Sequence, residues 1–337
     1  MDTVLIFGAT GTVGVYSALR LKELGYNVIA VGRRKSDNGF FADHDIRYYS
    51  VDIVHPEEFC KLPQDKINCI LHFAGAMPAR MKGYDPQQYI DTIVTGTLNV
   101  LEYSRRVKAD KIVFTQSISD SLYLGGTTQP IPADIVRKFP LNNDHSVYVI
   151  AKNAAVDLIE HYYAAYGLKR FILRLPTIYL YHPDPYYYVN GEKRKMFYRQ
   201  FIDKALNGEA IDVWGDPRRM KEIVYVKDFV QIVEKCVAAE SDGGFYNVGG
   251  EKGVTLEEQI KGIIDAFSPV DKKSAMNYLP GMPDASQFIF DITKTRQELG
   301  YKPAYPYLES LRDFKREMET QPFAKLWGKE EDYRKEK

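Results

Sequence analysis

Short apolar runs alternate with longer amphipathic stretches over the first half of the chain. Runs without a polar face are typical of strands in a parallel sheet that is covered on both sides. The stretches between them predict helices, and this order predicts an α/β fold with a Rossmann-like, doubly wound parallel sheet. The predicted strands are residues 4–7, 26–31, 46–51, 67–73 and 111–115, and the clearest predicted helices are residues 89–104 and 146–166.

The regular alternation ends near residue 179, and the remainder predicts a smaller α+β domain. Amphipathic helices are expected at residues 196–206, 255–267 and 308–318, whereas residues 224–238 are expected to return to the first domain. The predicted division is a cofactor domain of residues 1–178 with about 223–246, a substrate domain of residues 179–222 and 247–320, and a charged, frayed tail of residues 321–337.

Three glycines separate the first strand from the first helix, in the stretch Gly8-Ala9-Thr10-Gly11-Thr12-Val13-Gly14. A strand, a glycine turn and a helix in this order form the context in which such a motif binds a dinucleotide. The first glycine permits the turn, the second lets the backbone approach the pyrophosphate, and the third lets the helix lie close. The diphosphate is expected at the helix N-terminus, where N–H groups are free. The predicted contacts are Gly8, Thr10, Gly11, Thr12, Val13 and Gly14.

The charge balance narrows the class of partner. The 337 residues include 45 basic and 45 acidic side chains, which argues against nucleic acid as the main partner. No apolar run reaches membrane-spanning length, and the glycine motif begins too early to leave room for a signal peptide, so a cytoplasmic protein is expected. Cys60, Cys69 and Cys236 lack metal spacing and are interpreted as reduced core thiols, so no metal site is predicted.

The residues that close the second strand bear on the choice of cofactor. An acidic residue there would bind the 2′-hydroxyl of the adenosine ribose, whereas an arginine would accept a 2′-phosphate. This chain has Gly32-Arg33-Arg34-Lys35 and no carboxylate. Arg33 and Arg34 therefore favour NADP over NAD, and the alternative interpretation is a solvated basic turn.

Polar or small residues follow three further strands. Asp52 and Ile53 follow the third strand, where a carboxylate could accept a bond from the adenine amino group. Ala74, Gly75 and Ala76 follow the fourth, where small residues let the backbone pass close to the cofactor. Ser117 ends the fifth. Because the carboxyl ends of parallel strands share one edge, these residues are expected in one site with the glycine turn. His72, within the fourth strand, is interpreted as a core histidine.

Tyr148 and Lys152 lie four residues apart and therefore on one face of the helix that begins near residue 146. An ammonium beside a phenol favours the phenolate and lowers the pKa of the tyrosine. A phenolate can take the proton of a sugar hydroxyl while hydride leaves for a nicotinamide. Ser117 could align the same hydroxyl, and Lys152 could also bind the nicotinamide ribose. We therefore predict a catalytic group of Ser117, Tyr148 and Lys152.

As a set, these motifs resemble the extended short-chain dehydrogenase/reductases of the nucleotide-sugar epimerase/dehydratase group. The resemblance runs in order from about residue 3 to residue 315. Its later blocks fall on Gly96-Thr97-Leu98-Asn99, Leu173-Arg174, Trp214-Gly215-Asp216 and Val224-Tyr225-Val226-Lys227-Asp228. The resemblance adds Pro176 and Ile178 to the expected cofactor contacts. It also implies a substrate-binding set of Arg80, Ser117, Thr177, His182 and Lys221.

Several positions depart from the family pattern. Dehydratases of the family place an Asp-Glu pair after the catalytic threonine, but Ile118 and Ser119 follow Ser117. Without an acid to protonate a leaving hydroxyl, 4,6-dehydration is not expected. Lys221 replaces the family's phosphate-binding arginine and lacks its bidentate fork. Thr177 stands near a position where many members carry asparagine.

Residues 179–198 are rich in tyrosine, and basic side chains stand towards the end of this stretch. Tyrosine rings suit a sugar or a base, and basic residues attract a diphosphate. The alternative is a long surface loop or a contact between subunits. His182, in this stretch, is interpreted mainly as a loop histidine, with a second catalytic acid as the alternative.

The resemblance implies an NAD(P)-dependent enzyme that acts on a nucleotide-activated sugar. The first interpretation is a C4 epimerase that oxidises the sugar transiently, and the alternative is an NADPH-dependent 4-keto-sugar-nucleotide reductase. A reductase or isomerase of a non-sugar substrate is a third possibility. A non-catalytic NAD(P)-sensing or scaffold protein is a fourth, which the intact Ser117, Tyr148 and Lys152 argue against. A homodimer is expected, because many relatives pair through two helices.

Overall fold

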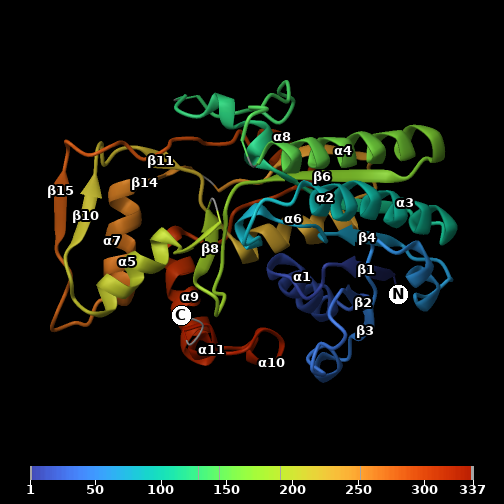
Figure 1. Cartoon of the computed structure of the whole chain (residues 1–337), viewed down its shortest axis with the longest axis horizontal. Helices are drawn as coiled ribbons and strands as arrows, with labels where there is room; N and C mark the ends of the chain where they lie inside the picture. Colours follow the sequence, from blue (N-terminus) through green and yellow to red (C-terminus); the bar gives the residue numbers. More distant parts are fainter. Residues whose placement is uncertain (1, 128, 144, 190, 251, 335–337) are drawn as a thin grey trace.

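The computed structural model describes residues 2–127, 129–143, 145–189, 191–250 and 252–334. Its centre is a seven-stranded sheet in the order β3–β2–β1–β4–β5–β6–β13, in which every neighbouring pair is parallel (Figure 1). This arrangement confirms the predicted doubly wound sheet. The strands are β1 (Thr3–Phe7), β2 (Asn27–Gly32), β3 (Arg47–Ser50), β4 (Cys69–His72), β5 (Lys111–Ser117), β6 (Lys169–Leu175) and β13 (Gly243–Asn247).

Helices cover both faces of the sheet because successive residues of a strand point to opposite sides. Val4 and Ile6 of β1 belong to the core that includes α1 (Thr12–Glu23) and α6 (Val226–Ala238). Leu5 and Phe7 belong to the core beneath the helices of the other face. Those helices are α2 (Pro86–Tyr89), a π-helical turn (Ile90–Thr95), α3 (Gly96–Arg106) and α4 (Ser146–Tyr166).

A smaller α+β part packs around its own apolar cluster at the other end of the molecule (Figure 1). Its main elements are α5 (Phe197–Leu206), α7 (Leu256–Phe267), α9 (Tyr307–Thr320), β10 (Ile211–Trp214) and β15 (Met276–Leu279). The remaining short strands and helix are β7 (Ile178–Tyr179), β8 (Tyr186–Val189), β9 (Glu192–Lys195), β11 (Met220–Lys221), β12 (Val224–Tyr225), β14 (Val254–Thr255) and α8 (Thr293–Leu299). Single 3₁₀ turns occur at Ala42–His44, Pro56–Lys61, Pro78–Arg80, Ile118–Asp120 and Leu122–Leu124.

The chain crosses between the two parts more than once. β12 pairs in parallel with β7, and β13 then adds to the large sheet beside β6. Residues 224–247 therefore lie with the cofactor half, where the sequence pattern places the returning segment.

The tyrosine-rich stretch separates into buried and surface residues. Tyr179 is buried and lies against the partly buried Tyr198, with ring centroids 5.1 Å apart, and Tyr181 is packed edge-on against Phe314. Residues 186–189 and 192–195 pair as the antiparallel strands β8 and β9. Tyr179 and Tyr181 are therefore core residues, whereas the tyrosines of β8 are half-buried.

The chain end corrects two sequence-based expectations. Residues 321–334 are not frayed: they form α10 (Ala324–Trp327) and α11 (Glu330–Arg334), and Phe323, Leu326 and Trp327 are buried. The charged composition conceals an apolar stripe at helical spacing. The second correction concerns Cys60, which is exposed on a 3₁₀ turn, whereas Cys69 and Cys236 are buried as expected.

Gly14 offers a direct test of how closely the first helix lies on the glycine turn. A Cβ atom at Gly14 would lie 2.2 Å from the carbonyl oxygen of Gly8 and 2.9 Å from Cα of Ala9. Because both neighbours are backbone, Gly14→Ala is expected to lower the free energy of unfolding by about 1–3 kcal/mol. Urea denaturation of the cofactor-free protein measures this change. Gly83→Ala is the control, since a Cβ there meets open space. Equal midpoints for the two variants would contradict the close approach.

Candidate active site

The strand order reverses between β1 and β4, and both strands end beside the glycine turn. Gly8 has a positive φ of 84°, and a Cβ there would lie 2.7 Å from the backbone nitrogen of Ala74. Only glycine fits this position, because the chain leaving β4 passes directly over it. Open α/β sheets bind ligands at such a reversal point.

The N-terminus of α1 has the features of an anion site. Gly11 is its N-cap in extended conformation, no side chain caps the helix, and no acidic residue lies in its first turn. The backbone N–H groups of Thr12, Val13 and Gly14 therefore begin the helix without a side-chain acceptor at its N-cap. These residues fit the diphosphate of a dinucleotide, which would lie on the helix N-terminus.

The end of β2 is crowded by side chains at Gly32. A Cβ at Gly32 would lie 3.0 Å from the side chain of Thr10 and 3.1 Å from the hydroxyl of Tyr48. Arg33 and Arg34 follow it and are exposed. The hydroxyl of Tyr48 donates to the carbonyl of Arg34 at 2.6 Å, which fixes the backbone of this turn.

Asp52 and Ile53 follow β3 at the same edge. Asp52 accepts a hydrogen bond from the backbone of Val54, and its own N–H donates to Glu58 at 2.8 Å. Ile53 is buried against Gly96 of α3, where an added Cβ would lie 2.6 Å from the Ile53 side chain. Ile53 thus contributes to this edge of the sheet by packing against Gly96.

Ser117, Tyr148 and Lys152 meet where β5 ends against α4. Burial raises the pKa of Tyr148, whereas the nearby hydroxyl of Ser117 lowers it. The ammonium of Lys152 donates to the carbonyl of Thr115 at 2.7 Å and lies 4.5 Å from the ring centroid of Phe114. Burial lowers the pKa of Lys152 to about 7. In the cofactor-free protein, burial and Ser117 therefore dominate the Tyr148 pKa.

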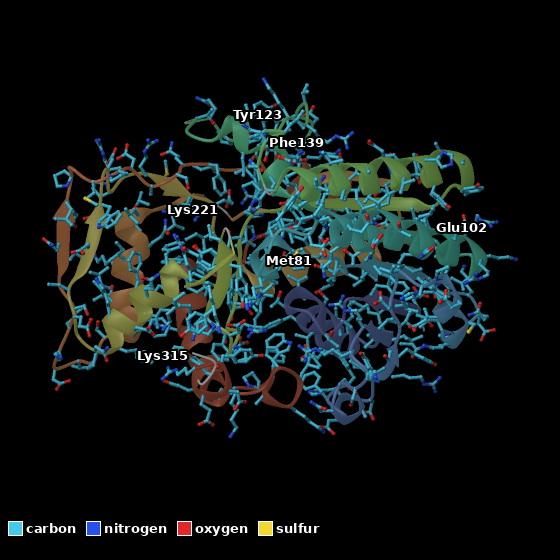
Figure 2. All side chains as sticks on the ribbon, viewed as in Figure 1. Met81, Glu102, Tyr123, Phe139, Lys221 and Lys315 are labelled. Carbon is cyan, nitrogen blue, oxygen red and sulfur yellow. The ribbon has the colours of Figure 1, made fainter. Side chains whose placement is uncertain are left out.

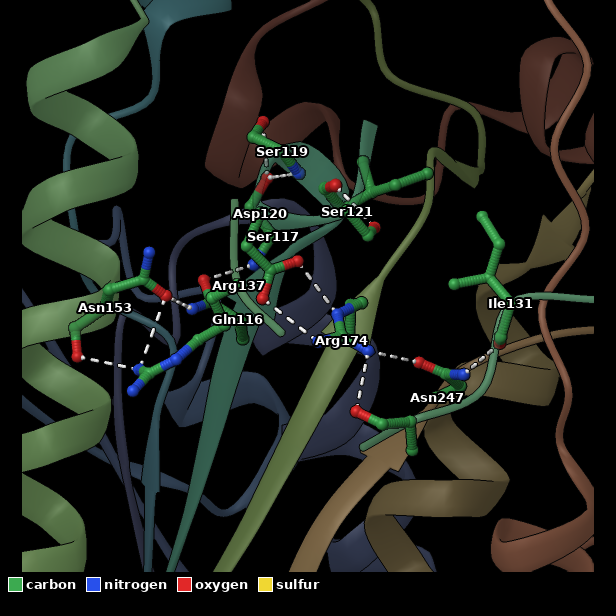
Figure 3. A network of polar contacts seen from close by, with 12 residues as sticks. Gln116, Ser117, Ser119, Asp120, Ser121, Ile131, Arg137, Asn153, Arg174 and Asn247 are labelled. Carbon is green, nitrogen blue, oxygen red and sulfur yellow. Dashed lines mark hydrogen bonds and ion pairs between the residues drawn. The ribbon is translucent and has the colours of Figure 1, made fainter. Parts of the chain in front are cut away.

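Two polar contacts fix Ser117 relative to α4 and β6 (Figure 3). The side chain of Gln116 accepts from the N–H of Ser117 at 2.6 Å and donates to Asn153, the neighbour of Lys152, at 2.9 Å. Asp120, three residues after Ser117, accepts two bonds from Arg174 of β6, at 2.9 and 3.1 Å. Both members of this ion pair are at most 1% exposed.

A cavity of about 260 Å³ lies beside this group. Tyr89 lines the cavity and packs edge-on against Tyr148, with ring centroids 5.7 Å apart. The remaining wall comes from the loop after β4, the start of α4 and the β8–β9 hairpin, and Met81 of this wall lies near the middle of the molecule (Figure 2). Its other lining residues are Pro78, Gly83, Tyr84, His145, Tyr188 and Gly191.

Arg80 and His182 tie the two parts of the molecule together. Arg80 forms an ion pair with Asp184 at 2.7 Å and also donates to the carbonyl of Tyr186. His182 accepts a bond from the N–H of Asp184 and packs at a tilt against Trp327, with centroids 4.6 Å apart. Burial lowers the pKa of His182 to about 3, which favours the neutral imidazole at pH 7.

The other expected contacts occupy different surroundings. Pro176 is buried and Thr177 is exposed in the turn between β6 and β7, where Ile178 pairs with Val224. Lys221 lies on β11 with its ammonium 4.9 Å from the ring of Phe197, and burial lowers its pKa. Of the predicted substrate contacts, Arg80 and His182 meet at Asp184, and the roles of Thr177 and Lys221 stay predictions.

His72 and His182 predict a pH dependence of stability. His72 is buried as expected, bonds to Thr97 and has a pKa lowered to about 3, as has His182. Between about pH 6.5 and 3 the unfolded chain binds protons at these histidines that the native protein does not. The free energy of unfolding is therefore expected to fall with falling pH, by about 1.4 kcal/mol per pH unit and histidine.

Urea denaturation between pH 6 and 4 measures this slope in the wild type and in His182→Asn. The variant is expected to lose one histidine's share of the slope. His161→Asn, which alters an exposed histidine of α4, is the control. A variant slope equal to that of the wild type would contradict the buried, neutral state of His182.

Comparison with known proteins agrees with this geometry. A family model described as the NAD dependent epimerase/dehydratase family matches residues 4–249. The chain belongs to the NAD-dependent epimerase/dehydratase family. Among curated relatives, a putative UDP-glucose 4-epimerase of Methanocaldococcus jannaschii is 26% identical over 92% of this chain and 96% of its own length. A dTDP-glucose 4,6-dehydratase of Xanthomonas campestris is 24% identical over 92% and 91%.

A solved structure shows the same fold in another family member. The UDP-glucuronic acid 4-epimerase of Bacillus cereus, in complex with UDP-glucuronic acid and NAD, superposes with a TM-score of 0.71. It is 20% identical and covers 95% of this chain and 99% of its own. No helix in the described part of the chain is long and apolar enough to cross a membrane.

Sequence reasoning missed three parts of the site. Each of the three joins segments that are distant in the sequence. They are the lining of the cavity by Tyr89 and Tyr188, the Asp120–Arg174 ion pair, and the approach of Trp327 to the glycine turn. A signal was present only for Trp327, since Phe323, Leu326 and Trp327 form a helical apolar stripe.

Proposed function

We propose that this family member is an NAD(P)-dependent C4 epimerase of a nucleotide-activated sugar. The observation that carries the proposal is the proximity of Ser117 and Tyr148 at the carboxyl edge of the sheet, next to Tyr89, which lines a cavity of about 260 Å³. The glycine turn on β1 and the N-terminus of α1 lie at the same edge. The activities named for similar proteins, which include UDP-sugar 4-epimerases, support the substrate class.

Tyr148, Ser117 and Lys152 have separate roles in the proposed reaction. A nicotinamide dinucleotide held by the glycine turn and the N-terminus of α1 would supply a reversible hydride acceptor. Tyr148 takes the proton of the sugar C4 hydroxyl and later returns it to the keto oxygen. Ser117 holds that oxygen within reach of Tyr148. Lys152 contributes an ammonium at the carboxyl edge of the sheet. Its positive charge favours the phenolate form of Tyr148 once cofactor and substrate are bound.

The acid–base inventory argues against 4,6-dehydration. Elimination of a hydroxyl needs an acid next to the catalytic hydroxyl group. Ser119 stands there, and Ser117 donates to it at 3.0 Å. Asp120 is the next acidic residue along the chain, but both of its carboxylate oxygens accept from Arg174 and it is fully buried. An epimerase or a reductase needs no such acid.

The runner-up is an NADPH-dependent 4-keto-sugar-nucleotide reductase. Arg33 and Arg34 favour it, because they follow β2 at a position where the chain carries no carboxylate. A reductase consumes its cofactor and must exchange it, whereas an epimerase regenerates its own. The homodimer also stays a proposal, which size-exclusion chromatography with light scattering measures.

The first experiment separates the two functions. Nucleotides released from the purified protein by denaturation are identified by mass spectrometry. The native protein is then incubated with UDP-glucose or UDP-glucuronic acid, without added cofactor, and the C4 epimers are resolved by proton NMR. Retained NAD or NADP together with epimer formation supports the epimerase. An empty site and oxidation of added NADPH that depends on a 4-keto sugar nucleotide support the reductase instead.

A further inference from the structure

The C-terminal segment, defined here as residues 321–334, lies against the glycine turn. The indole N–H of Trp327 donates to the carbonyl of Thr10 at 2.9 Å. Phe323 packs on Tyr16 of α1, with ring centroids 4.8 Å apart. The side chains of Phe323 and Trp327 are at most 5% exposed. The segment therefore supports the turn from the outside as a packed element.

The same segment holds the loop that follows β2 (Figure 1). The guanidinium of Arg34 donates to the carbonyl of Leu326. Asn38 donates to the carbonyl of Lys325 at 3.0 Å, and the Lys325 ammonium donates to the carbonyl of Gly39 at 3.2 Å. Arg34 is one of the two residues whose charge bears on the 2′-position of the cofactor. The contact with Leu326 restricts where its guanidinium can lie.

The other side of the segment contacts the smaller part of the molecule. Trp327 packs at a tilt against His182, and the hydroxyl of Tyr333 donates to the carbonyl of Trp327 at 2.6 Å. Glu330 forms an ion pair at 2.9 Å with Arg199, whose side chain is 2% exposed. Trp327 thus lies between the glycine turn and His182, in the segment that follows β7. One residue touches both halves of the molecule.

We propose that the C-terminal segment is a positioning element of the dinucleotide site, which fixes Thr10 and Arg34 at its adenosine end. The inference rests on the proposed function only in requiring that a nicotinamide dinucleotide binds at the glycine turn. Coupling between two sites is reciprocal. If the docked segment favours the dinucleotide, the bound dinucleotide must in turn hold the segment in place.

Hydrogen–deuterium exchange on the full chain tests this reciprocity without measuring activity. The protein is first freed of nucleotide and then saturated with NAD or NADP. Amides of residues 321–334 are expected to exchange more slowly in the saturated protein, together with those of the glycine turn. Protection of the glycine turn without any change in residues 321–334 overturns the inference alone. Absence of dinucleotide binding to the wild type overturns the cofactor assignment as well.

Trp327→Phe tests the same coupling from the other side. Phenylalanine keeps a ring against His182 but removes the N–H that donates to Thr10. Loss of one such bond is expected to raise the Kd for the dinucleotide by about tenfold. Glu331→Gln is the matched control, because Glu331 belongs to the same segment, is exposed, and its replacement leaves the contacts of Trp327 and Lys325 in place. Equal Kd values for the wild type and Trp327→Phe, measured by isothermal titration calorimetry, contradict the proposal.

Discussion

Replacement of Tyr148 by phenylalanine is expected to reduce turnover by about 10²–10⁴-fold, the usual contribution of a general base. Tyr148 is 8% exposed, lies close to Ser117 and packs against Tyr89 of the cavity wall, so little water can reach the site to replace the phenol as a base. Phenylalanine keeps the ring and its packing. The loss is therefore expected in kcat, with the Kd for the dinucleotide near that of the wild type.

Conversion of the sugar nucleotide and calorimetric binding of the dinucleotide measure the two quantities separately. Tyr162→Phe is the control, because Tyr162 lies on the same helix and its hydroxyl bonds to Glu102, away from Ser117. Wild-type turnover in Tyr148→Phe would remove Tyr148 from the chemistry. Unchanged biological activity of a variant without turnover would favour the non-catalytic, sensing interpretation of this protein.

Local pattern accounts for much of the fold. The apolar runs and the glycine spacing locate the sheet, and the helix predicted at residues 146–166 coincides with α4 (Ser146–Tyr166). Gly8 and Gly14 have the steric roles expected of them, since an added Cβ would strike the backbone at either position. These features depend on residues close together in the sequence, where periodicity and backbone sterics carry the information.

Contacts between distant segments were beyond that reasoning. Asp120 and Arg174 stand 54 residues apart, and Thr10 and Trp327 stand 317 apart, so no local period relates them. His182 shows the consequence for function. Its sequence neighbourhood admits a catalytic acid, but Trp327 covers it from the far end of the chain and burial keeps it neutral. Composition likewise labels residues 321–334 as charged, although three of their apolar side chains are buried.

The Asp120–Arg174 pair is expected to give the largest loss of stability. Arg174→Met would leave the carboxylate of Asp120 fully buried without its partner, and would remove donors to Ala133 and Asn247 (Figure 3). Removal of one member of a buried ion pair costs about 3–5 kcal/mol. Urea denaturation at pH 7 measures the change. Arg312→Met, which breaks an exposed pair with Glu309, is expected to cost at most about 1 kcal/mol.

The double variant Asp120→Leu with Arg174→Met identifies the origin of that loss. If the cost comes from the unpartnered charge, the double variant is expected to be more stable than Arg174→Met alone, because no buried charge remains. A double variant as unstable as the sum of the two single variants would instead assign the loss to packing and to the other bonds of Arg174. Turnover separates stability from positioning. Asp120 closes the 3₁₀ turn that begins directly after Ser117, so a double variant that regains stability but not kcat makes the ion pair a positioning device for Ser117.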